Sequence, residues 1–453
     1  MDIVKYLARY LTIPLFDKRE GKTIGPFLKE LRESQYYSPG KIRELQLSKL
    51  KDILIYADKH CSFYTRRFAD CGFNPQSFSS FEDIKKIPIL TKDDIRSNQE
   101  HIVSDRFKIK DLFYKRTGGS TSVPLKLYVD FQACDRKLAA TLRHNSWANY
   151  NRGDKLAAIW GDTEREYSFK EKVYNYFNTR TIYLDTLLMS EDYNKKFIQK
   201  VRNFKPTVMM GHAHSLYALA CFIEEHKIAD LGIRGIISTA EILYEHERAR
   251  IEKLFGKVLF NRYGCEELSI IASECDQHDG LHIHAEGLHV EVDGGDETNP
   301  GRLIITDLDN RGMPFIRYEI GDMATTKTGE CGCGRGLPRL GKIYGRTADL
   351  LYTPDGRTIS GISVLDTFTI HIPGVKQVQI IQDKLDVLNF KIVKNDDFND
   401  KSLGSFKEKI PLYFGKSMKY NIEYVEKIVQ TERGKYRFSI CNIPQEKRGA
   451  KPL

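Results

Sequence analysis

The sequence predicts an α/β protein of two domains, and three observations support that prediction. Between residues 110 and 330, short β-rich runs alternate with longer amphipathic segments, which is typical of layered α/β sheets. Residues 289–309 instead form short alternating runs joined by Gly- and Asp-rich turns, as in a small antiparallel sheet or barrel. From about residue 350 onward, strand-like runs surround one helix-like run, which predicts a small α+β domain.

The single elements follow from the spacing of apolar residues. Residues 26–72 carry apolar side chains three and four positions apart, which predicts helices packed on a core. Thr91 precedes a lysine and two aspartates and is predicted to cap a helix. Residues 6–16 are also amphipathic and are predicted to pack on the core, with a membrane surface or a partner as the alternative. The predicted strands are 155–160, 207–210, 235–238, 377–382, 387–393 and 421–425, and the predicted helices between them are 192–203, 243–255 and 402–413.

Composition narrows the class of protein. The 453 residues have a formal net charge of +9, and the 70 basic side chains are scattered among 61 acidic ones, which argues against a nucleic-acid partner. No apolar run approaches the ~20 residues of a membrane helix, and the start of the chain does not resemble a signal peptide. The nine cysteines, an odd number, argue against a disulfide framework and fit a reducing compartment. We therefore expect a cytoplasmic protein without a transmembrane segment.

The strongest local motif is Thr-Gly-Gly-Ser-Thr-Ser-Val-Pro at residues 117–124. Its glycines let the backbone approach an anion closely, and its hydroxyls can donate hydrogen bonds to phosphate oxygens. No Gly-Lys-Ser/Thr follows, so the run is not a Walker loop. Taken alone, it equally predicts a flexible Gly/Ser loop.

Three single residues have side chains suited to a nucleotide. Glu267 follows a Tyr-Gly pair, where a carboxylate can hold Mg²⁺ on phosphate oxygens. Asp322 follows a glycine turn and can accept both hydroxyls of a ribose, and Lys435 can neutralise charge at an α-phosphate. Each also has an ordinary explanation: a solvated surface acid, a turn aspartate and an exposed lysine.

The order of these motifs resembles the adenylate-forming superfamily of acyl-CoA synthetases. More narrowly, the chain looks like the phenylacetate–CoA ligase family, in the CapK-like branch associated with capsular polysaccharide. The resemblance covers about residues 27–440. The motifs are the Gly/Ser/Thr loop, Tyr-Gly-x-x-Glu at 263–267, Arg-Tyr-x-x-Gly-Asp at 317–322, Gly-Arg-x-x-Asp at 345–349 and Gly-Lys at 434–435; supporting segments are 116–121, 274–275 with 280–282, 310–314 and 331–335.

This resemblance implies a large AMP-binding domain of layered α/β sheets with a β-barrel-like part, residues 1–348, and a small mobile α+β lid domain, residues 349–453. It also implies ATP and Mg²⁺, and an enzyme that activates a small carboxylic acid as an acyl-AMP. The implied roles are phosphate binding by Thr117, Gly118, Gly119, Ser120 and Thr121, adenine packing at Ala240 and Glu241, adenine and acyl contacts from Tyr263 and Gly264, Mg²⁺ binding by Glu267, ribose binding by Asp322, ribose or phosphate contact by Arg346, a hinge at Asp349, and adenylation by Lys435, with Thr121 and Glu267 also catalytic.

Two departures from the family pattern concern the phosphate loop and the acceptor. Ser122 stands where the family usually has glycine. Residues 350–357 match the capsule-associated branch and not the CoA-ligase pattern, so the acceptor stays open between CoA and an amine or hydroxyl of a sugar or carrier lipid. A non-catalytic nucleotide-binding scaffold in polysaccharide assembly is the alternative of another class. The sequence names neither the acid nor the oligomeric state, although the family resemblance makes a homodimer one option.

Cysteine and histidine residues of the central region predict a metal site. Cys275, His282, Cys331 and Cys333 offer three thiolates and one imidazole, which suits a closed, structural tetrahedral zinc site. His278 and His284 are alternative ligands, and unliganded thiols in a Gly-rich turn are the competing interpretation.

Two further histidines follow an apolar strand. For His212 and His214 we expect either a contact with substrate or a simple helix-entry turn.

Overall fold

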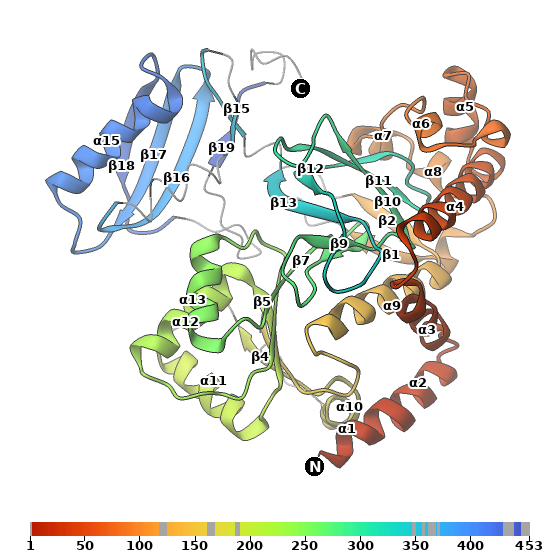
Figure 1. Cartoon of the computed structure of the whole chain (residues 1–453), viewed down its shortest axis with the longest axis horizontal. Helices are drawn as coiled ribbons and strands as arrows, with labels where there is room; N and C mark the ends of the chain where they lie inside the picture. The colour runs from red at the N-terminus through yellow and green to blue at the C-terminus, as the bar shows by residue number, and fades with distance from the viewer. Residues whose placement is uncertain are drawn as a thin grey trace. The chain divides into compact units, whose positions relative to one another are not determined.

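A computed structural model describes residues 2–116, 125–160, 168–185, 191–346, 350–355, 358–360, 368, 372–428 and 439–444 (Figure 1). The chain divides into two compact units. The first comprises Met1–Thr298, Leu303–Ile320 and Thr325–Lys342; the second comprises Asn299–Arg302, Gly321–Ala324 and Ile343–Leu453. The boundary at residue 348 that the resemblance implies stays a prediction, since residues 347–349 lie outside the described residues.

Helices dominate the first hundred residues. Thr91 caps α7 through a hydrogen bond of 3.1 Å from the Asp94 backbone N–H to the Thr91 hydroxyl, as predicted. The predicted helices of residues 26–72 are confirmed as α3, α4 and α5, and each buries apolar side chains. The elements are α1 (Ile3–Leu7), η1 (Ala8–Thr12), α2 (Ile13–Arg19), α3 (Ile24–Ser34), α4 (Pro39–His60), α5 (Ser62–Asp70), η2 (Pro75–Ser77), α6 (Phe81–Ile84), α7 (Lys92–Ser97), α8 (Gln99–Ile102) and η3 (Ile109–Asp111).

The N-terminal helices α1, η1 and α2 depart from the predicted core packing. Tyr10 is 70% exposed and Leu15 57% exposed, and Tyr6 and Leu11 are exposed as well. The prediction that residues 6–16 pack on the core is wrong for these side chains. Within residues 6–16 only Ala8 and Ile13 are buried, so most side chains of the segment lie outside the core.

One sheet, most of whose residues belong to the first unit, has the strand order β10-β11-β12-β13-β9-β8-β7-β6-β5-β3-β4. Strands β3 to β7 are parallel, and β8 joins antiparallel to β7. The predicted antiparallel strands of residues 289–309 continue this sheet, whose described strands follow one open order. The strands are β3 (Leu156–Trp160), β4 (Thr181–Asp185), β5 (Val208–His212), β6 (Gly235–Thr239), β7 (Leu259–Cys265), β8 (Ser269–Ser273), β9 (Leu281–Ile283), β10 (Leu288–Asp293), β11 (Gly301–Asp307), β12 (Tyr318–Lys327) and β13 (Arg339–Arg346), with a separate hairpin of β1 (Phe113–Arg116) and β2 (Lys126–Val129).

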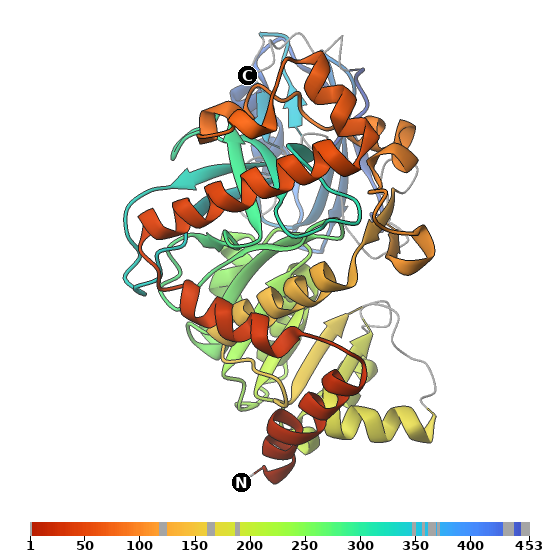
Figure 2. The ribbon, with the colours of Figure 1, turned by 90° about the vertical axis from the view of Figure 1, so that its right-hand side faces the viewer.

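Helices pack against both faces of this sheet. On one face, apolar residues of α11, α12 and α13 pack against β3, β5 and β6. On the other face, α9 packs against α3 and against Ile270 of β8, and Figure 2 shows α4 lying across the antiparallel strands. The helices are α9 (Phe131–Trp147), α10 (Phe169–Tyr174), η4 (Asn175–Thr179), α11 (Glu191–Phe204), α12 (Ala213–Glu225) and α13 (Glu245–Phe255). The predicted α/β layering is confirmed.

The second unit has its own sheet and core. Its four strands run in the order β18-β17-β16-β19, and α15 packs on them through Phe406, Ile410 and Phe414. Together with a two-stranded sheet, these elements form the small α+β fold that the sequence predicts. They are β14 (Leu350–Tyr352), β15 (Thr358–Ser360), β16 (Val375–Lys384), β17 (Val387–Lys394), α15 (Asp400–Phe414), β18 (Lys419–Tyr424) and β19 (Ser439–Cys441). Across both units, none of the described helices is long and apolar enough to cross a bilayer.

Candidate active site

Four side chains lie level with one another where the parallel strands end. His212 of β5 is opposite Thr239 of β6, and Thr239 is opposite Arg262 of β7. Trp160 ends β3 one residue beyond the pair Ile159–Gly211, so it reaches the same level, and its ring centroid is 4.4 Å from that of His212. Neighbouring strands in register place side chains at one level on the same face. We call Trp160, His212, Thr239 and Arg262 the edge row. Ligands of open α/β sheets bind at such carboxyl ends.

The predicted adenine residues follow directly from these strands. Ala240 and Glu241 come after the last residue of β6, and Tyr263 and Gly264 continue β7 beside them. Ala240 has a φ of +66°, in the left-handed region that few non-glycine residues occupy. Such strained residues persist where the surrounding structure fixes them, often at ligand sites. The structure thus brings these four predicted residues to one edge of the sheet.

Gly264 is required by a close approach of two strands. The pairing of β7 with β8 shifts register between Tyr263 and Gly264, which marks a β-bulge. A Cβ atom at Gly264 would lie well inside van der Waals distance of the Ser269 carbonyl oxygen and 3.2 Å from the Ile270 Cα. Only glycine therefore fits here, and the tight strand pair carries the chain into the turn with Glu267.

Glu267 is held in place by two residues that sequence reasoning did not single out. The buried Tyr318 donates its hydroxyl to Oε1 of Glu267 at 3.1 Å. Lys137 Nζ donates to the Glu267 carbonyl at 3.3 Å and forms a buried ion pair of 2.7 Å with Asp307. Burial acts to lower the pKa of Lys137, but Asp307 outweighs it and raises that pKa. The half-buried Glu267 is therefore anchored, with its second carboxylate oxygen unbonded to any described residue.

Of these two supporting residues, only Tyr318 is marked by a signal in the sequence. Tyr318 belongs to the Arg-Tyr-x-x-Gly-Asp motif, so its position beside a site was available from the motif. Lys137 is a lysine within a helix rich in alanine, and the sequence does not show that it is buried. His212, one of two expected substrate contacts, lies in the edge row, whereas the side chain of His214 is outside the described part of the chain.

Other predicted site residues are placed only in part. Asp322 lies on β12 after Gly321, which has a φ of +90°, and belongs to the second unit. Arg346 is the last residue of β13, and its side chain is outside the described residues. Also outside them are Thr117, Gly118, Gly119, Ser120, Thr121, Ser122, Asp349 and Lys435.

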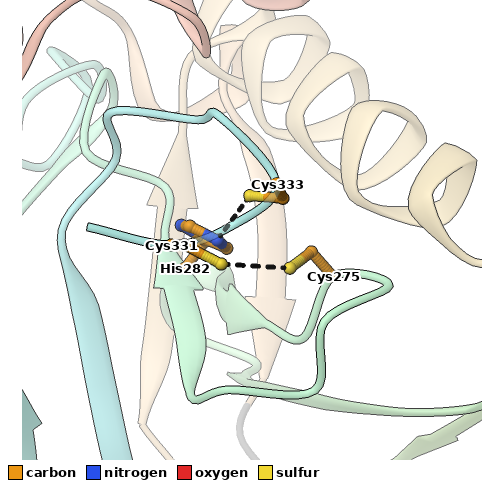
Figure 3. Close-up of side chains that lie close together, drawn as sticks. All are labelled: Cys275, His282, Cys331 and Cys333. Atoms are coloured by element: carbon orange, nitrogen blue, oxygen red, sulfur yellow. Dashed lines mark hydrogen bonds between the residues drawn. The ribbon is translucent and has the colours of Figure 1, made fainter. Parts of the chain in front are cut away.

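The predicted zinc ligands converge. The ligand atoms of Cys275, His282, Cys331 and Cys333 all lie within 4.8 Å of one another (Figure 3), and we call these residues the Cys/His cluster. The Cys275 and Cys331 sulfurs are 3.7 Å apart, and Cys333 Sγ is 3.3 Å from Nε2 of His282. Zn–S bonds of ~2.3 Å in a tetrahedron put sulfurs ~3.8 Å apart, so the spacing fits zinc.

The protonation chemistry of the cluster also suits a metal. Nδ1 of His282 donates to the Leu337 carbonyl at 3.1 Å, which leaves Nε2 as the ligand atom. Burial lowers the pKa of His282 to about 4, so its imidazole is neutral at neutral pH. Burial also raises the pKa of the Cys275 thiol to about 12 in the absence of a cation. A divalent metal would supply the positive charge that stabilises the thiolates.

The alternative ligands belong to other interactions. Nδ1 of His278 is 3.2 Å from Oε2 of Glu274. Nδ1 of His284 lies 3.4 Å from Oε2 of Glu286. The cluster in the described residues therefore contains His282 and neither of these two.

Comparison with known proteins supports the fold of an adenylate-forming ligase. The fold is that of an acyl-CoA ligase structure, 2-hydroxyisobutyryl-CoA ligase in the postadenylation state in complex with R3-HIB-AMP: the TM-score is 0.72 at 19% identity, over 92% of each chain. In sequence, the chain is 25% identical to Protein CapK of Staphylococcus aureus over 92% of this chain and 94% of that protein. It is 26% identical to phenylacetate-coenzyme A ligase of Pseudomonas putida over 72% of this chain and 74% of that ligase.

The small domain is similar to one particular family. Residues 351–442 match the family model described as the CapK C-terminal domain. The resemblance to CapK and to phenylacetate–CoA ligases that the motifs predict is thereby confirmed, and so is the adenylate-forming ligase fold.

Proposed function

We propose that this chain is an ATP-dependent ligase that activates a small carboxylic acid as an acyl-adenylate and passes the acyl group to an acceptor. The observation that carries the proposal is the anchored Glu267 beside the strand end at Tyr263 and Gly264, in the motif order of adenylate-forming enzymes. A carboxylate fixed in this way suits Mg²⁺, which takes one or two protein carboxylates together with substrate phosphates.

The remaining residues receive their roles from the motifs. The substrate carboxylate bonds to the α-phosphorus of ATP, and the bond to pyrophosphate breaks. In this proposal Glu267 holds Mg²⁺ on the phosphates, the loop of residues 117–121 binds the β- and γ-phosphates, and Lys435 neutralises charge at the α-phosphate. Ala240, Glu241 and Tyr263 contact adenine, Asp322 binds the ribose, and Arg346 contacts ribose or phosphate.

For the acceptor, the first candidate is the thiol of CoA, because the relatives include phenylacetate-coenzyme A ligases. A second candidate is an amine or hydroxyl of a surface-polysaccharide precursor. It is favoured by coverage: similarity to the P. putida ligase spans 72% of this chain, whereas similarity to Protein CapK spans 92% and the small domain matches the CapK model. A cytoplasmic location and a homodimer stay predictions.

We also propose that the Cys/His cluster holds a structural zinc ion. All four ligands are protein side chains, so no position is left for a catalytic water. The ion would tie the segment from Cys275 to His282 to the loop that carries Cys331 and Cys333, and it has no part in the adenylation step.

The experiment that tests the ligase proposal is ATP–pyrophosphate exchange over a panel of carboxylic and amino acids, followed by product analysis with CoA. Exchange that requires one acid supports adenylation, and acyl-CoA formation would then identify the thiol as acceptor. Exchange without acyl-CoA favours the precursor. A chain that neither binds ATP nor exchanges with any acid would contradict the ligase proposal and favour a non-catalytic scaffold.

A further inference from the structure

Arg262 of the edge row has an unusual set of partners. Its guanidinium donates to Oδ1 of Asn145 at 2.9 Å, to the Thr239 hydroxyl at 3.4 Å and to the Met210 sulfur at 3.6 Å. All three acceptors are neutral. Within the part of the chain that the structure describes, no aspartate or glutamate is paired with it.

The most buried arginines of the chain are treated differently. Four described arginines are less than a tenth exposed, and every one has a carboxylate partner. The pairs are Arg143 with Glu286, Arg180 with Asp2, Arg317 with Glu291, and Arg339 with Asp279. Burying a cation without an anion is costly, so pairing is the expected arrangement. Arg262, which is half-buried, has no such partner among the described residues, and it lies at the edge where ligands of such sheets bind.

We infer that Arg262 binds a second acidic group on the substrate, so that the acid activated by this ligase is a dicarboxylic acid or a close anionic analogue. The inference rests on the proposed function, because it takes the edge row as part of the acyl site. One carboxylate of the substrate is adenylated, and the other accepts two parallel N–H bonds from the guanidinium, the geometry that arginine offers to carboxylates.

The neighbours of Arg262 suit this role. Asn145 and Thr239 orient the guanidinium without neutralising it. Burial raises the pKa of Tyr150 to about 12, so this phenol is uncharged at neutral pH and supplies no anion. Burial lowers the pKa of Arg262 to about 10, which still leaves it cationic at neutral pH. The rings of Trp160 and His212 are tilted by 51° with centroids 4.4 Å apart, and they give the row an aromatic end for the apolar part of a substrate.

The test compares dicarboxylates from succinate to adipate with monocarboxylates of equal chain length, in wild type, Arg262→Met and Arg262→Lys. The matched control is Arg234→Met, since Arg234 is exposed and comes directly before β6. Two readouts are used: ATP–pyrophosphate exchange, and the shift in unfolding temperature caused by each acid in the presence of ATP and Mg²⁺. We expect wild type to prefer a dicarboxylate. Arg262→Met should lose about 30-fold or more of that activity and should exchange with the matching monocarboxylate instead.

The outcomes separate this inference from the proposed function. Exchange by wild type with monocarboxylates, unchanged in Arg262→Met, leaves the ligase standing and overturns the assignment of Arg262. Stabilisation by a dicarboxylate that Arg262→Met abolishes, without exchange by any acid, supports Arg262 and overturns the ligase activity. No stabilisation and no exchange with any dicarboxylate overturns the inference. If Arg262→Met does not fold, Arg262→Lys decides, because lysine keeps the positive charge but cannot donate two parallel N–H bonds. This variant should weaken dicarboxylate exchange and leave monocarboxylate exchange unaffected.

Discussion

Arg143 lies on helix α9 and Arg262 contacts the same helix, but the two guanidinium groups differ in which groups neutralise their charge. Arg143 is fully buried on α9 and donates to Glu286 through both terminal nitrogens, at 3.0 and 3.2 Å. Arg262 is half-buried on β7 and reaches the Asn145 side chain of α9, with no described carboxylate partner. Burial acts to raise the pKa of Glu286, but Arg143 outweighs it and holds that pKa below its usual range.

The two arginines therefore differ in role. The charge of Arg143 stabilises the fold, whereas the charge of Arg262 can bind a ligand. The Arg143–Glu286 pair joins α9 to the segment before β10, and Ser34 of α3 donates a third hydrogen bond of 2.7 Å to Glu286. Removing either partner would leave a buried charge alone. Arg262 lies at strand ends, where an incoming anion can complete the pair. Charge pairing thus distinguishes the two roles where residue type alone does not.

The largest effect on stability is expected from breaking the internal pair. Glu286→Gln leaves the Arg143 cation uncompensated and should reduce the free energy of unfolding by about 3–5 kcal/mol. Urea unfolding measures this change, with Glu33→Gln, an exposed acid on α3, as the control. A Glu286→Gln protein as stable as the control would mean that the pair does not hold α9 in place.

The Cys/His cluster extends the comparison to the proposed zinc site. Purified protein should contain about one zinc per chain, because binding to a folded site of four ligands is strong. Cys331→Ser should abolish the bound zinc and lower the unfolding temperature, whereas Cys71→Ser, outside the cluster, should change neither. Elemental analysis and thermal unfolding test this. Stable, metal-free wild-type protein would favour unliganded thiols.

A smaller effect is expected at the strand end next to Arg262. Gly264→Ala places a methyl group against the Ser269 carbonyl, so β7 and β8 must separate. We expect a loss of about 1–3 kcal/mol in the free energy of unfolding, together with weaker ATP-dependent exchange. The control is Gly25→Ala, where an added Cβ meets no atom within 4 Å. Equal behaviour of the two variants would contradict the close strand approach.

The smallest stability change is predicted for Arg262 itself. Arg262→Met removes a cation that has no described carboxylate partner, so the free energy of unfolding should change by less than about 1 kcal/mol or increase. Denaturant unfolding in the absence of any acid measures it. A loss as large as that of Glu286→Gln would show that a protein carboxylate neutralises Arg262, and the contrast between the two arginines would disappear.

Much of this account was accessible from the sequence, because its signals are local. Gly264 and Glu267 are marked by a short motif, and the cysteine pair at 331 and 333 indicates a metal before any fold is known. Apolar spacing similarly predicted the helices α3 to α5. Each of these depends on residues close together in the chain.

The rest depends on register and packing between distant segments. Arg262 joins the edge row only because β5, β6 and β7 pair in one register, and its lack of a carboxylate is a property of the packed structure. The ion pair of Lys137 with Asp307 joins distant segments in the same way. The choice of His282 over its two neighbouring histidines likewise depends on which strand face meets the loop at Cys331.

The central claim is that this chain forms an acyl-adenylate, and the most direct measurement is to follow both half-reactions in wild type and Lys435→Ala. We predict that Lys435→Ala slows ATP–pyrophosphate exchange by about 100- to 1,000-fold, since one electrostatic contact to the transition state is lost. Transfer of the acyl group from preformed acyl-adenylate should stay near the wild-type rate. Absence of acid-dependent exchange in wild type, or equal loss of both half-reactions in the variant, would contradict the account.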